Sequence, residues 1–424
     1  MKILQVHKYY SKKRGSGSVT AFFEIVKILK KKGHRVAIFS MQDETNKPND
    51  YEKYFTTHFD LNEKVGFWKM VILAGKIIFN REAQKKLAEL LDKEKPEIAH
   101  LHNFYHYLSP SIILTLKKKN IPIVMTLHDY KLICPNYKLF SQGKICEKCK
   151  GGKYYQCFLN KCSKNSYAAS LTLMIEAYLH KILKTYEKVD LFIAPSHFMK
   201  EKCVEFGIPA KKISVLKNPF ATEDFRINGE WQEKDYFLYY GRLSEEKGIG
   251  DLIRATKKLF DEKKLGENKL FILGKGPEKE NLERLVTELK LQDKIYFLGF
   301  KTGEELKKTI GSAKFIVLPS VWFDNLPLIV LESQLLQRPL IISDLGGSKE
   351  LMLTGETGFI FIGGDVEDLV DKMNHVLTLT PEERKAMGEK GRKNALAVND
   401  EEKLYIKLLA IYQEVLDRCT RKED

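Results

Sequence analysis

Short apolar runs alternate along the chain with longer segments in which apolar residues recur every three or four positions. Such runs are typical of strands buried on both faces of a parallel sheet, and the longer segments are typical of the amphipathic helices that cover it. The first half of the chain has apolar runs at 2–7, 35–40, 98–101, 122–127 and 191–194. A helical period spans 18–32. The alternation predicts the α/β fold class.

The same pattern begins again after Asn218-Pro219. The second half has apolar runs at 236–240, 270–273, 295–298, 315–318 and 340–343. Each run ends in a turn that contains glycine, proline or serine, as expected for strands followed by loops. With 424 residues, 43% of them apolar, the chain can form two cores of ordinary size. We therefore expect two open, Rossmann-like domains in tandem, at 1–215 and 216–401.

Two carboxylates, Asp324 and Glu332, flank an apolar run in the segment that follows the strand at 315–318. Asp324 falls in the loop, and Glu332 is expected two turns inside the next helix. A helix N-terminus offers free backbone amides and the positive end of the helix dipole, so this loop suits an anion such as a pyrophosphate. The carboxylates would then bind hydroxyls on either side of the anion.

A basic loop, GRLSEEKG at 241–248, follows the strand at 236–240. Ligands of open parallel sheets bind at the carboxyl ends of strands, where this loop lies. Arg242 can contact a diphosphate as a two-pronged donor, and Lys247 can contact it as a point charge. Surface charges with no ligand are the alternative for these two residues taken alone.

Two loops in the first half carry weaker signals. The segment Arg14-Gly15-Ser16-Gly17-Ser18 precedes a helix, where Gly17 would let the backbone approach a phosphate or sugar; a plain flexible turn is the alternative. His128 follows the strand at 122–127 and can donate to a sugar hydroxyl or stabilise charge near a reacting carbon. A core histidine is the alternative, and His100 and His102 are similar cases.

Charge is distributed unevenly along the chain. Residues 1–220 hold 39 Lys and Arg against 19 Asp and Glu, whereas residues 221–424 hold 32 against 37. The basic first half predicts an anionic partner: a phospholipid surface, a phosphorylated acceptor or nucleic acid. Solvated lysines on helix faces are the alternative.

The apolar stretch 65–79 is interrupted by lysines and is too short to cross a bilayer. It predicts either a helix in the membrane interface, with Trp68 among its apolar residues, or a helix packed on its own domain. The first residues read as a strand, so we expect no secretion signal and a cytoplasmic protein.

Five of the seven cysteines lie between 134 and 162, with lysines between them. Cys146, Cys149, Cys157 and Cys162 have spacings compatible with a structural zinc site, with Cys134 as a substitute ligand. Free thiols in a packed loop are the alternative.

Taken together, the motifs resemble those of glycosyltransferase family 4, whose members have the GT-B architecture of two Rossmann-like domains facing a cleft. The matching segments are GHRV at 33–36, HDYKLICPN at 128–136, IAPSHF at 193–198, LKNPF at 216–220, GRLSEEKG at 241–248, LGKGPEKENL at 273–282, and PSVWFDNLPLIVLES through GGSKEL at 319–351. The match runs essentially from end to end. In this architecture 1–215 would bind the acceptor, 216–401 the nucleotide sugar, and a C-terminal helix at 402–424 would pack back on the first domain.

The resemblance implies a retaining hexosyltransferase that uses a UDP- or GDP-linked sugar and needs no bound metal. Arg242 and Lys247 would hold the diphosphate, Glu332 the nucleotide ribose, Asp324 the donor hexose, and His128 the sugar from the opposite domain. Other expected donor-binding positions are Gly17, Asn325, Leu326 and Leu328. The chain departs from the family in having Asp324 where glutamate is usual and Ser16-Gly17 where two glycines are usual.

The expected role is transfer to a saccharide or lipid-linked acceptor in cell-surface polysaccharide synthesis, at the inner face of the cell membrane, with no nucleic-acid partner. A nucleotide-sugar epimerase and a catalytically inactive binding protein of the same fold remain alternatives. A glycogen-type phosphorylase would need a lysine that carries pyridoxal phosphate, and no motif singles one out.

Overall fold

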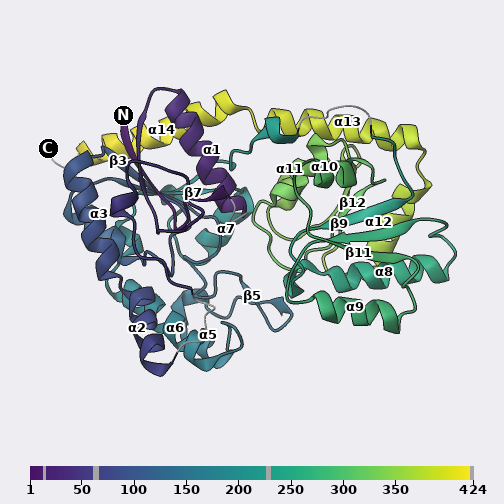
Figure 1. Cartoon of the computed structure of the whole chain (residues 1–424), viewed down its shortest axis with the longest axis horizontal. Helices are drawn as coiled ribbons and strands as arrows, with labels where there is room; N and C mark the ends of the chain where they lie inside the picture. Colours follow the sequence, from purple (N-terminus) through teal and green to yellow (C-terminus); the bar gives the residue numbers. More distant parts are fainter. Residues whose placement is uncertain (13–15, 61–65, 226–230, 421–424) are drawn as a thin grey trace. The chain divides into compact units, whose positions relative to one another are not determined.

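A computed structural model of the chain describes residues 1–12, 16–60, 66–225 and 231–420, and these residues divide into two compact units (Figure 1). Unit 1 consists of Met1–Ser141, Glu147–Phe220 and Glu401–Asp424, and unit 2 of Gln142–Cys146 and Ala221–Asp400. The division after Phe220 lies beyond the boundary at 215 that the sequence suggests. Residues 421–424 of the expected C-terminal helix lie outside the described residues.

Unit 1 is built on a parallel sheet in the order β2-β1-β3-β4-β7-β8. Its strands are β1 (Lys2–Val6), β2 (Arg35–Phe39), β3 (Ile98–Leu101), β4 (Ile123–Thr126), β7 (Leu191–Ala194) and β8 (Ile213–Val215). The strands β3, β4 and β7 are buried at every residue, as expected for strands covered on both faces. Two short strands, β5 (Phe140–Ser141) and β6 (Lys144–Ile145), pair with each other.

The helices of unit 1 are α1 (Gly17–Lys31), α2 (Phe67–Ile78), α3 (Arg81–Glu94), α4 (Ser111–Lys118), α5 (Tyr155–Leu159), α6 (Tyr167–Ile182), α7 (His197–Glu205) and α14 (Glu401–Thr420). The last helix joins a core formed by the beginning of the chain. Leu404, Leu408 and Tyr412 of α14 pack in one buried cluster with Ile3 of β1 and Phe22 of α1. Residues some 400 positions apart therefore share one hydrophobic core.

Unit 2 is built on a second parallel sheet, in the order β11-β10-β9-β12-β13-β14. Its strands are β9 (Tyr236–Tyr240), β10 (Lys269–Leu273), β11 (Ile295–Gly299), β12 (Ile316–Leu318), β13 (Leu340–Ser343) and β14 (Gly358–Phe361). Its helices are α8 (Ile249–Asp261), α9 (Lys279–Glu288), α10 (Gly303–Gly311), α11 (Leu328–Leu335), α12 (Val366–Thr378) and α13 (Pro381–Val398). The α/β class predicted from the sequence is confirmed.

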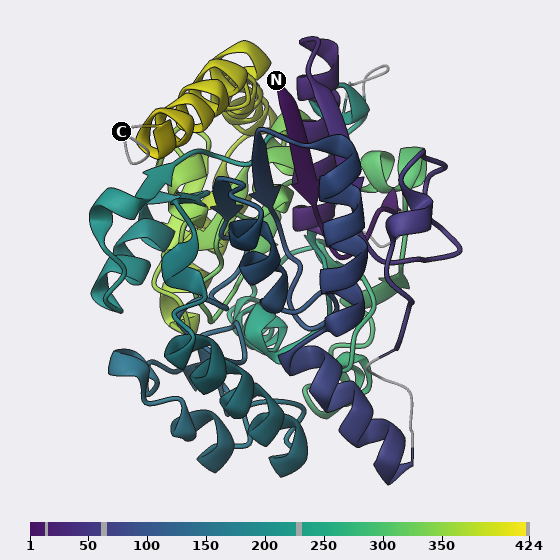
Figure 2. The same ribbon diagram turned by 90° about the vertical axis from the view of Figure 1, so that its left-hand side faces the viewer.

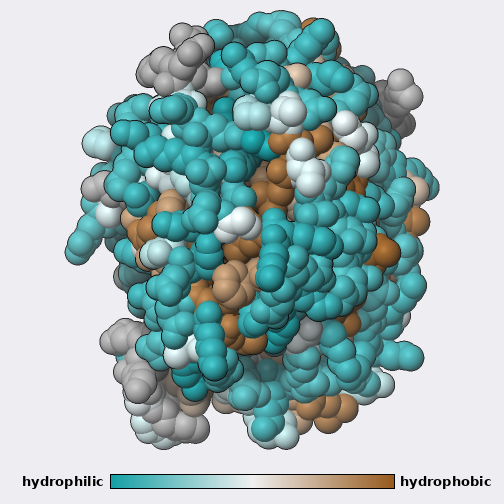
Figure 3. Space-filling model, turned by 90° about the vertical axis from the view of Figure 1, so that its right-hand side faces the viewer, coloured by the Kyte–Doolittle hydropathy of each residue, from teal (hydrophilic) through white to brown (hydrophobic). Residues whose placement is uncertain are grey.

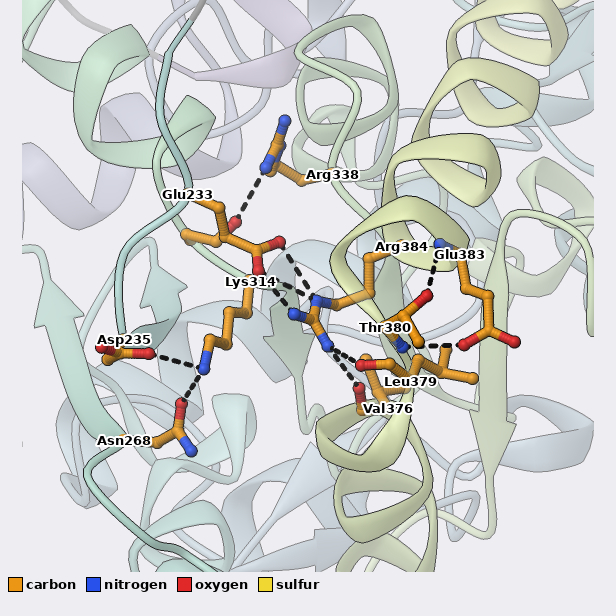
Figure 4. A network of polar contacts seen from close by, with 11 residues as sticks. Glu233, Asp235, Asn268, Lys314, Arg338, Val376, Leu379, Thr380, Glu383 and Arg384 are labelled. Atoms are coloured by element: carbon orange, nitrogen blue, oxygen red, sulfur yellow. Dashed lines mark hydrogen bonds and ion pairs between the residues drawn. The ribbon is translucent and has the colours of Figure 1, made fainter.

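The amino ends of the unit 2 strands are held by a polar network (Figure 4). The Arg384 guanidinium of α13 donates to Glu233 through Nε at 3.1 Å and Nη2 at 2.5 Å. Lys314, before β12, pairs with Asp235 at 2.7 Å and donates to Asn268 at 2.7 Å. Charged groups at this edge of the sheet therefore contact one another and secure α13 to the strands.

After Gly346-Gly347 the chain forms a single 3₁₀ turn, Ser348–Leu351. The turn ends at Met352, whose backbone is extended. Within the part of the chain that the structure describes, no helix has the length and apolar character needed to cross a bilayer.

Candidate functional site

The unit 2 sheet changes direction at β9. From β9 the chain runs outward to β10 and β11 on one side, then returns to the other side of β9 for β12, β13 and β14. Loops that leave neighbouring strands in opposite directions open a crevice at the carboxyl ends of those strands, where open α/β sheets bind ligands. The loops at this point follow β9 and β12, and they carry the motifs singled out by the sequence.

Gly248 lets the loop after β9 meet the loop after β12. Its backbone has φ of +65°, and a Cβ there would lie 1.9 Å from the carbonyl oxygen of Pro319. The Val321 amide donates to the carbonyl of Glu246 at 3.0 Å. Only glycine fits this position without moving a loop, which explains the final glycine of GRLSEEKG.

A third loop, after β13, holds the backbone of Asp324. The Gly347 amide donates to the carbonyl of Asp324 at 2.7 Å. Gly346 has φ of +81°, and a Cβ there would lie 2.0 Å from the same oxygen. The three motifs that are separate in the sequence therefore meet at one edge of the sheet.

Lys247 and Asp324 form an ion pair, with 2.6 Å between Nζ and Oδ2. The Ser320 hydroxyl donates to the same carboxylate oxygen at 3.4 Å, and the Lys247 ammonium lies 5.2 Å from the centre of the Trp322 ring. Both charged side chains are mostly buried, with exposed fractions of 19% and 14%. Because the pair is partly desolvated, an anion that reaches Lys247 would interact with it more strongly than in bulk water.

Arg242 is exposed at the same edge, and its guanidinium has no hydrogen-bond or ion-pair partner among the described residues. Its backbone is nevertheless fixed, because the buried Tyr239 hydroxyl donates to the Arg242 carbonyl at 2.8 Å. The loop therefore presents a cation from an anchored backbone.

Glu332 lies on α11, slightly more than one turn inside the helix, where the sequence suggested two turns. The helix begins only at Leu328, because Pro327 precedes it in an extended conformation. Burial raises the pKa of the Glu332 carboxyl to about 7, while a hydrogen bond from the Tyr240 hydroxyl acts in the opposite direction. Hydrogen-bond donors that approach the carboxylate would lower this pKa again. The Glu332 side chain is therefore suited to accept hydrogen bonds from hydroxyl groups.

The N-terminus of α11 has no capping hydrogen bond from the side chain of Pro327, its N-cap residue. Asn325 and Leu326, just before the helix, are almost fully buried. Backbone amides at such a terminus can bind a phosphate. The expected positions Asn325, Leu326 and Leu328 therefore lie at the N-terminal end of α11, beside Asp324.

His128, at the end of β4 in unit 1, belongs to a chain of hydrogen bonds. Its Nε2 lies 3.0 Å from Nδ1 of His102, and Nε2 of His102 lies 2.9 Å from Oε1 of Gln5. Burial, with a smaller effect of the Lys8 charge, lowers the pKa of His128 to about 3, and burial also lowers the pKa of His102. Both rings are neutral at pH 7.

The Gln5 side chain sets the direction of these hydrogen bonds. Its Oε1 can only accept, so His102 donates from Nε2 and its neutral ring accepts at Nδ1. His128 must therefore donate from Nε2, which leaves its Nδ1 as an acceptor. The Gln5 amide in turn donates to the Tyr412 hydroxyl of α14 at 3.1 Å.

His100 completes the chain on the other side of Tyr412. The Tyr412 hydroxyl lies 2.7 Å from Nδ1 of His100, and Nε2 of His100 lies 2.7 Å from the Thr126 hydroxyl. His100 is completely buried. The C-terminal helix contributes the group that joins the two halves of this network.

Gly17 is the first residue of α1, after Ser16, whose hydroxyl caps the helix by accepting from the Val19 amide at 3.4 Å. Arg14 and Gly15 lie outside the described residues. Gly17 and His128 belong to unit 1, and the other expected donor-binding residues belong to unit 2. Within unit 2 the structure brings the expected residues together at one sheet edge.

Four of the cysteines were expected to hold a structural zinc ion. Among the residues that the structure describes, no group of three or more His, Cys, Asp or Glu side chains is arranged to hold a metal ion. The zinc site at Cys146, Cys149, Cys157 and Cys162 therefore stays a prediction from their spacing. Cys157 and Cys162 hydrogen-bond to each other, and Cys149 is buried while Cys146 is partly exposed.

Several residues of these sites were not found from the sequence. In unit 2 they are Ser320, Trp322 and Tyr240, and the first two lie within the segment that the sequence marked. In unit 1 they are Gln5 and Tyr412, which no short motif connects. The available signal for Tyr412 was its place four residues after Leu408, on the apolar face of the last helix.

Two family models match the chain. The model of glycosyl transferases group 1 matches residues 220–394, and the model of Glycosyltransferase Family 4 matches residues 15–224. An uncharacterized glycosyltransferase of Methanocaldococcus jannaschii is 33% identical over 289 residues, which cover 65% of this chain and 64% of that protein. The lipopolysaccharide 1,6-galactosyltransferase of Salmonella typhimurium is 28% identical over 195 residues, covering 45% of this chain and 53% of that protein. The matches thus span less than two thirds of either relative.

Solved structures resemble this one over nearly its whole length. Sucrose-phosphate synthase from Thermosynechococcus elongatus has a TM-score of 0.71 at 18% identity, covering 98% of this chain and 99% of that chain. The Anabaena protein HepE, solved with UDP and glucose, has a TM-score of 0.67 at 16% identity, covering 98% and 100%. The two family models together reach from residue 15 to residue 394. The chain belongs to glycosyltransferase family 4 and has the GT-B fold.

Proposed function

We propose that this protein transfers a hexosyl group from a nucleotide diphosphate sugar to an acceptor hydroxyl, with retention at the anomeric carbon, in cell-surface polysaccharide synthesis. The observation that carries the proposal is the convergence of Lys247, Asp324 and Glu332 at the switch point of the unit 2 sheet. Relatives point the same way, since the similar Salmonella protein is named a lipopolysaccharide galactosyltransferase.

The proposed donor lies along this sheet edge with its ribose at Glu332 and its diphosphate at Arg242 and Lys247. A diphosphate that reaches Lys247 competes with Asp324 for the ammonium group. Release of Asp324 would leave its carboxylate able to accept hydrogen bonds from the hexose. Because Asp324 is one methylene shorter than the usual glutamate, its contact with the hexose differs from that of other family members.

Cleavage of the donor leaves negative charge on the departing diphosphate oxygen while positive charge grows at the anomeric carbon. Arg242, Lys247 and the amides at the start of α11 would stabilise the departing charge. Removing one such donor typically costs about 3 to 4 kcal/mol of transition-state stabilisation. These groups supply the positive charge, so the proposed reaction requires no metal.

The acceptor hydroxyl attacks the anomeric carbon from the side of the leaving group. The bond between that carbon and the diphosphate oxygen breaks, the new glycosidic bond forms, and the hydroxyl proton passes to the departing phosphate. In unit 1, His128 presents Nδ1 as an acceptor for a sugar hydroxyl. Transfer would take place in the cytoplasm, at the inner face of the cell membrane, where lipid-linked acceptors are available.

The test uses a panel of UDP- and GDP-linked hexoses with EDTA present. UDP-sugars come first because HepE was solved with UDP-glucose. Transfer or slow donor hydrolysis is expected, and the anomeric proton coupling in the NMR spectrum of the product should match that of the donor. An inverted product contradicts the mechanism. Binding without turnover supports an inactive binding protein, and conversion to an epimeric nucleotide sugar supports an epimerase.

A further inference from the structure

The outer face of α2 is apolar. Trp68, Val71 and Ile72 recur at the three- and four-residue spacing of one helix face, and Trp68 and Ile72 are 78% and 62% exposed. Surface helices of globular proteins normally turn such a stripe toward the core. On α2 the inward residues Leu73 and Ile77 are only partly buried, so apolar residues lie on both faces.

Two further helices extend this surface. Leu171, Ile175 and Ile182 are exposed along α6, which packs against α2 (Figure 2). Tyr155 and Leu159 are exposed on α5, which packs against α6. More than half of the exposed large apolar side chains among the described residues lie on α2, α5 and α6 or at Leu183, directly after α6. We call these three helices the apolar helix surface.

One face of unit 2 looks different. The side of unit 2 that faces the viewer in Figure 3 is mainly hydrophilic, and its apolar residues are interspersed with polar ones. Single exposed apolar residues are normal on soluble proteins, whereas a contiguous group marks a surface that binds something. The group on unit 1 is the case that requires a partner.

Charge identifies the partner. The one acidic residue in the sequences of α2, α5 and α6 is Glu176, which is buried and paired with Lys131. Exposed lysines lie on the same helices, at Lys69 and Lys181, or directly after them, at Lys184. Apolar side chains flanked by lysines suit a bilayer with anionic headgroups. A second copy of this surface would bring like charges together.

We propose that α2, α5 and α6 dock on the surface of an anionic lipid bilayer. Trp68 and Ile72 enter the boundary between headgroups and acyl chains, and the lysines contact the lipid phosphates. This docking does not depend on the chemistry at the unit 2 site. The docking proposal and the proposed transferase activity can therefore be refuted independently of each other. It would bring unit 1 to the surface where lipid-linked acceptors are found.

The test is co-sedimentation of the full chain with vesicles of phosphatidylcholine that contain increasing fractions of phosphatidylglycerol. Binding should rise with the anionic fraction, weaken at high salt, and shift tryptophan emission to shorter wavelength. The double variant Trp68→Ser/Ile72→Ser should bind about 10- to 100-fold more weakly, because two exposed apolar anchors are lost. The matched control is Ile406→Ser, which changes an exposed apolar residue of α14 in the same unit. It should bind like the wild-type chain.

Circular dichroism and donor hydrolysis of each variant show whether it is folded. Failure of the wild-type chain to bind anionic vesicles overturns the proposal, as does undiminished binding by the folded double variant. A third outcome would assign the surface to a second copy of the chain. In that case the wild-type chain does not bind lipid but self-associates in sedimentation velocity, and the double variant does not self-associate. Vesicle binding by the variant Lys69→Glu/Lys181→Glu should no longer increase with the fraction of phosphatidylglycerol. If it still increases, these two lysines do not contact the lipid phosphates.

Discussion

Replacing Glu332 with glutamine should make the ligand-free protein less sensitive to pH. Burial raises the pKa of the Glu332 carboxyl from 4.5 to about 7. The native state therefore holds this proton more tightly than the unfolded state does. The associated stabilisation is fully present below the unfolded pKa near 4.5 and is lost as pH rises through 7.

The size of the effect follows from the pKa difference. At about 1.4 kcal/mol for each pKa unit, the rise from 4.5 to about 7 corresponds to about 3 kcal/mol. The Glu332 side chain keeps some contact with solvent, which reduces the expected loss to roughly 1 to 3 kcal/mol. Between pH 5 and pH 8 the wild-type chain should lose this much more free energy of unfolding than Glu332→Gln does.

Urea unfolding at pH 5 and pH 8, followed by tryptophan fluorescence, measures the difference. Glu288→Gln is the matched control, because Glu288 is an exposed carboxylate on α9 of the same unit. It should behave like the wild-type chain. Nucleotide binding by Glu332→Gln should weaken, since an amide is a poorer acceptor for ribose hydroxyls. Equal losses of stability in the wild-type chain and Glu332→Gln would refute the assignment of this buried carboxyl.

Two other substitutions test the buried network of unit 1 and the loop contacts of unit 2. Tyr412→Phe removes the hydroxyl that joins the buried hydrogen-bond chain and should cost about 1 to 3 kcal/mol of unfolding free energy, because buried polar partners are left unpaired. The ¹⁵N shifts of the His128 ring should also change in that variant, while Tyr405→Phe on the same helix should leave them unchanged; identical spectra would contradict the chain. Gly346→Ala places a methyl group 2.0 Å from the Asp324 carbonyl at φ of +81° and should cost about 1 to 3 kcal/mol in urea unfolding, together with most of the turnover. Unchanged stability and rate would contradict the close approach of these loops.

Much of the fold follows from the sequence because strands buried on both faces form uninterrupted apolar runs. Short strands escape this pattern: β8 has three residues, and β14 is only partly buried. The loop motifs around Arg242 and Asp324 were found because glycine, proline and charged residues stand out beside such runs. Their contact through Gly248 could not be read from the sequence, because it depends on the order of the strands in the sheet.

The buried network around Tyr412 shows a second limit. Its residues come from three strands, or the segments next to them, and from the last helix, so no local spacing connects them. The cysteines show a third limit. The spacing from Cys146 to Cys162 is compatible with zinc ligands, but tetrahedral coordination requires four sulfurs to converge, and spacing alone does not determine that.

The most direct test of the account is donor binding and turnover by the double variant Arg242→Ala/Lys247→Met in the presence of EDTA. Isothermal titration calorimetry with UDP- and GDP-linked sugars, followed by a transfer or hydrolysis assay, gives both quantities. Lys308→Met, which changes an exposed lysine of α10, is the control. The account predicts that the wild-type chain and the control bind and turn over donor under chelation, whereas the double variant binds about 100-fold more weakly and loses turnover. Unchanged turnover by the double variant, or loss of wild-type turnover on chelation, would contradict it.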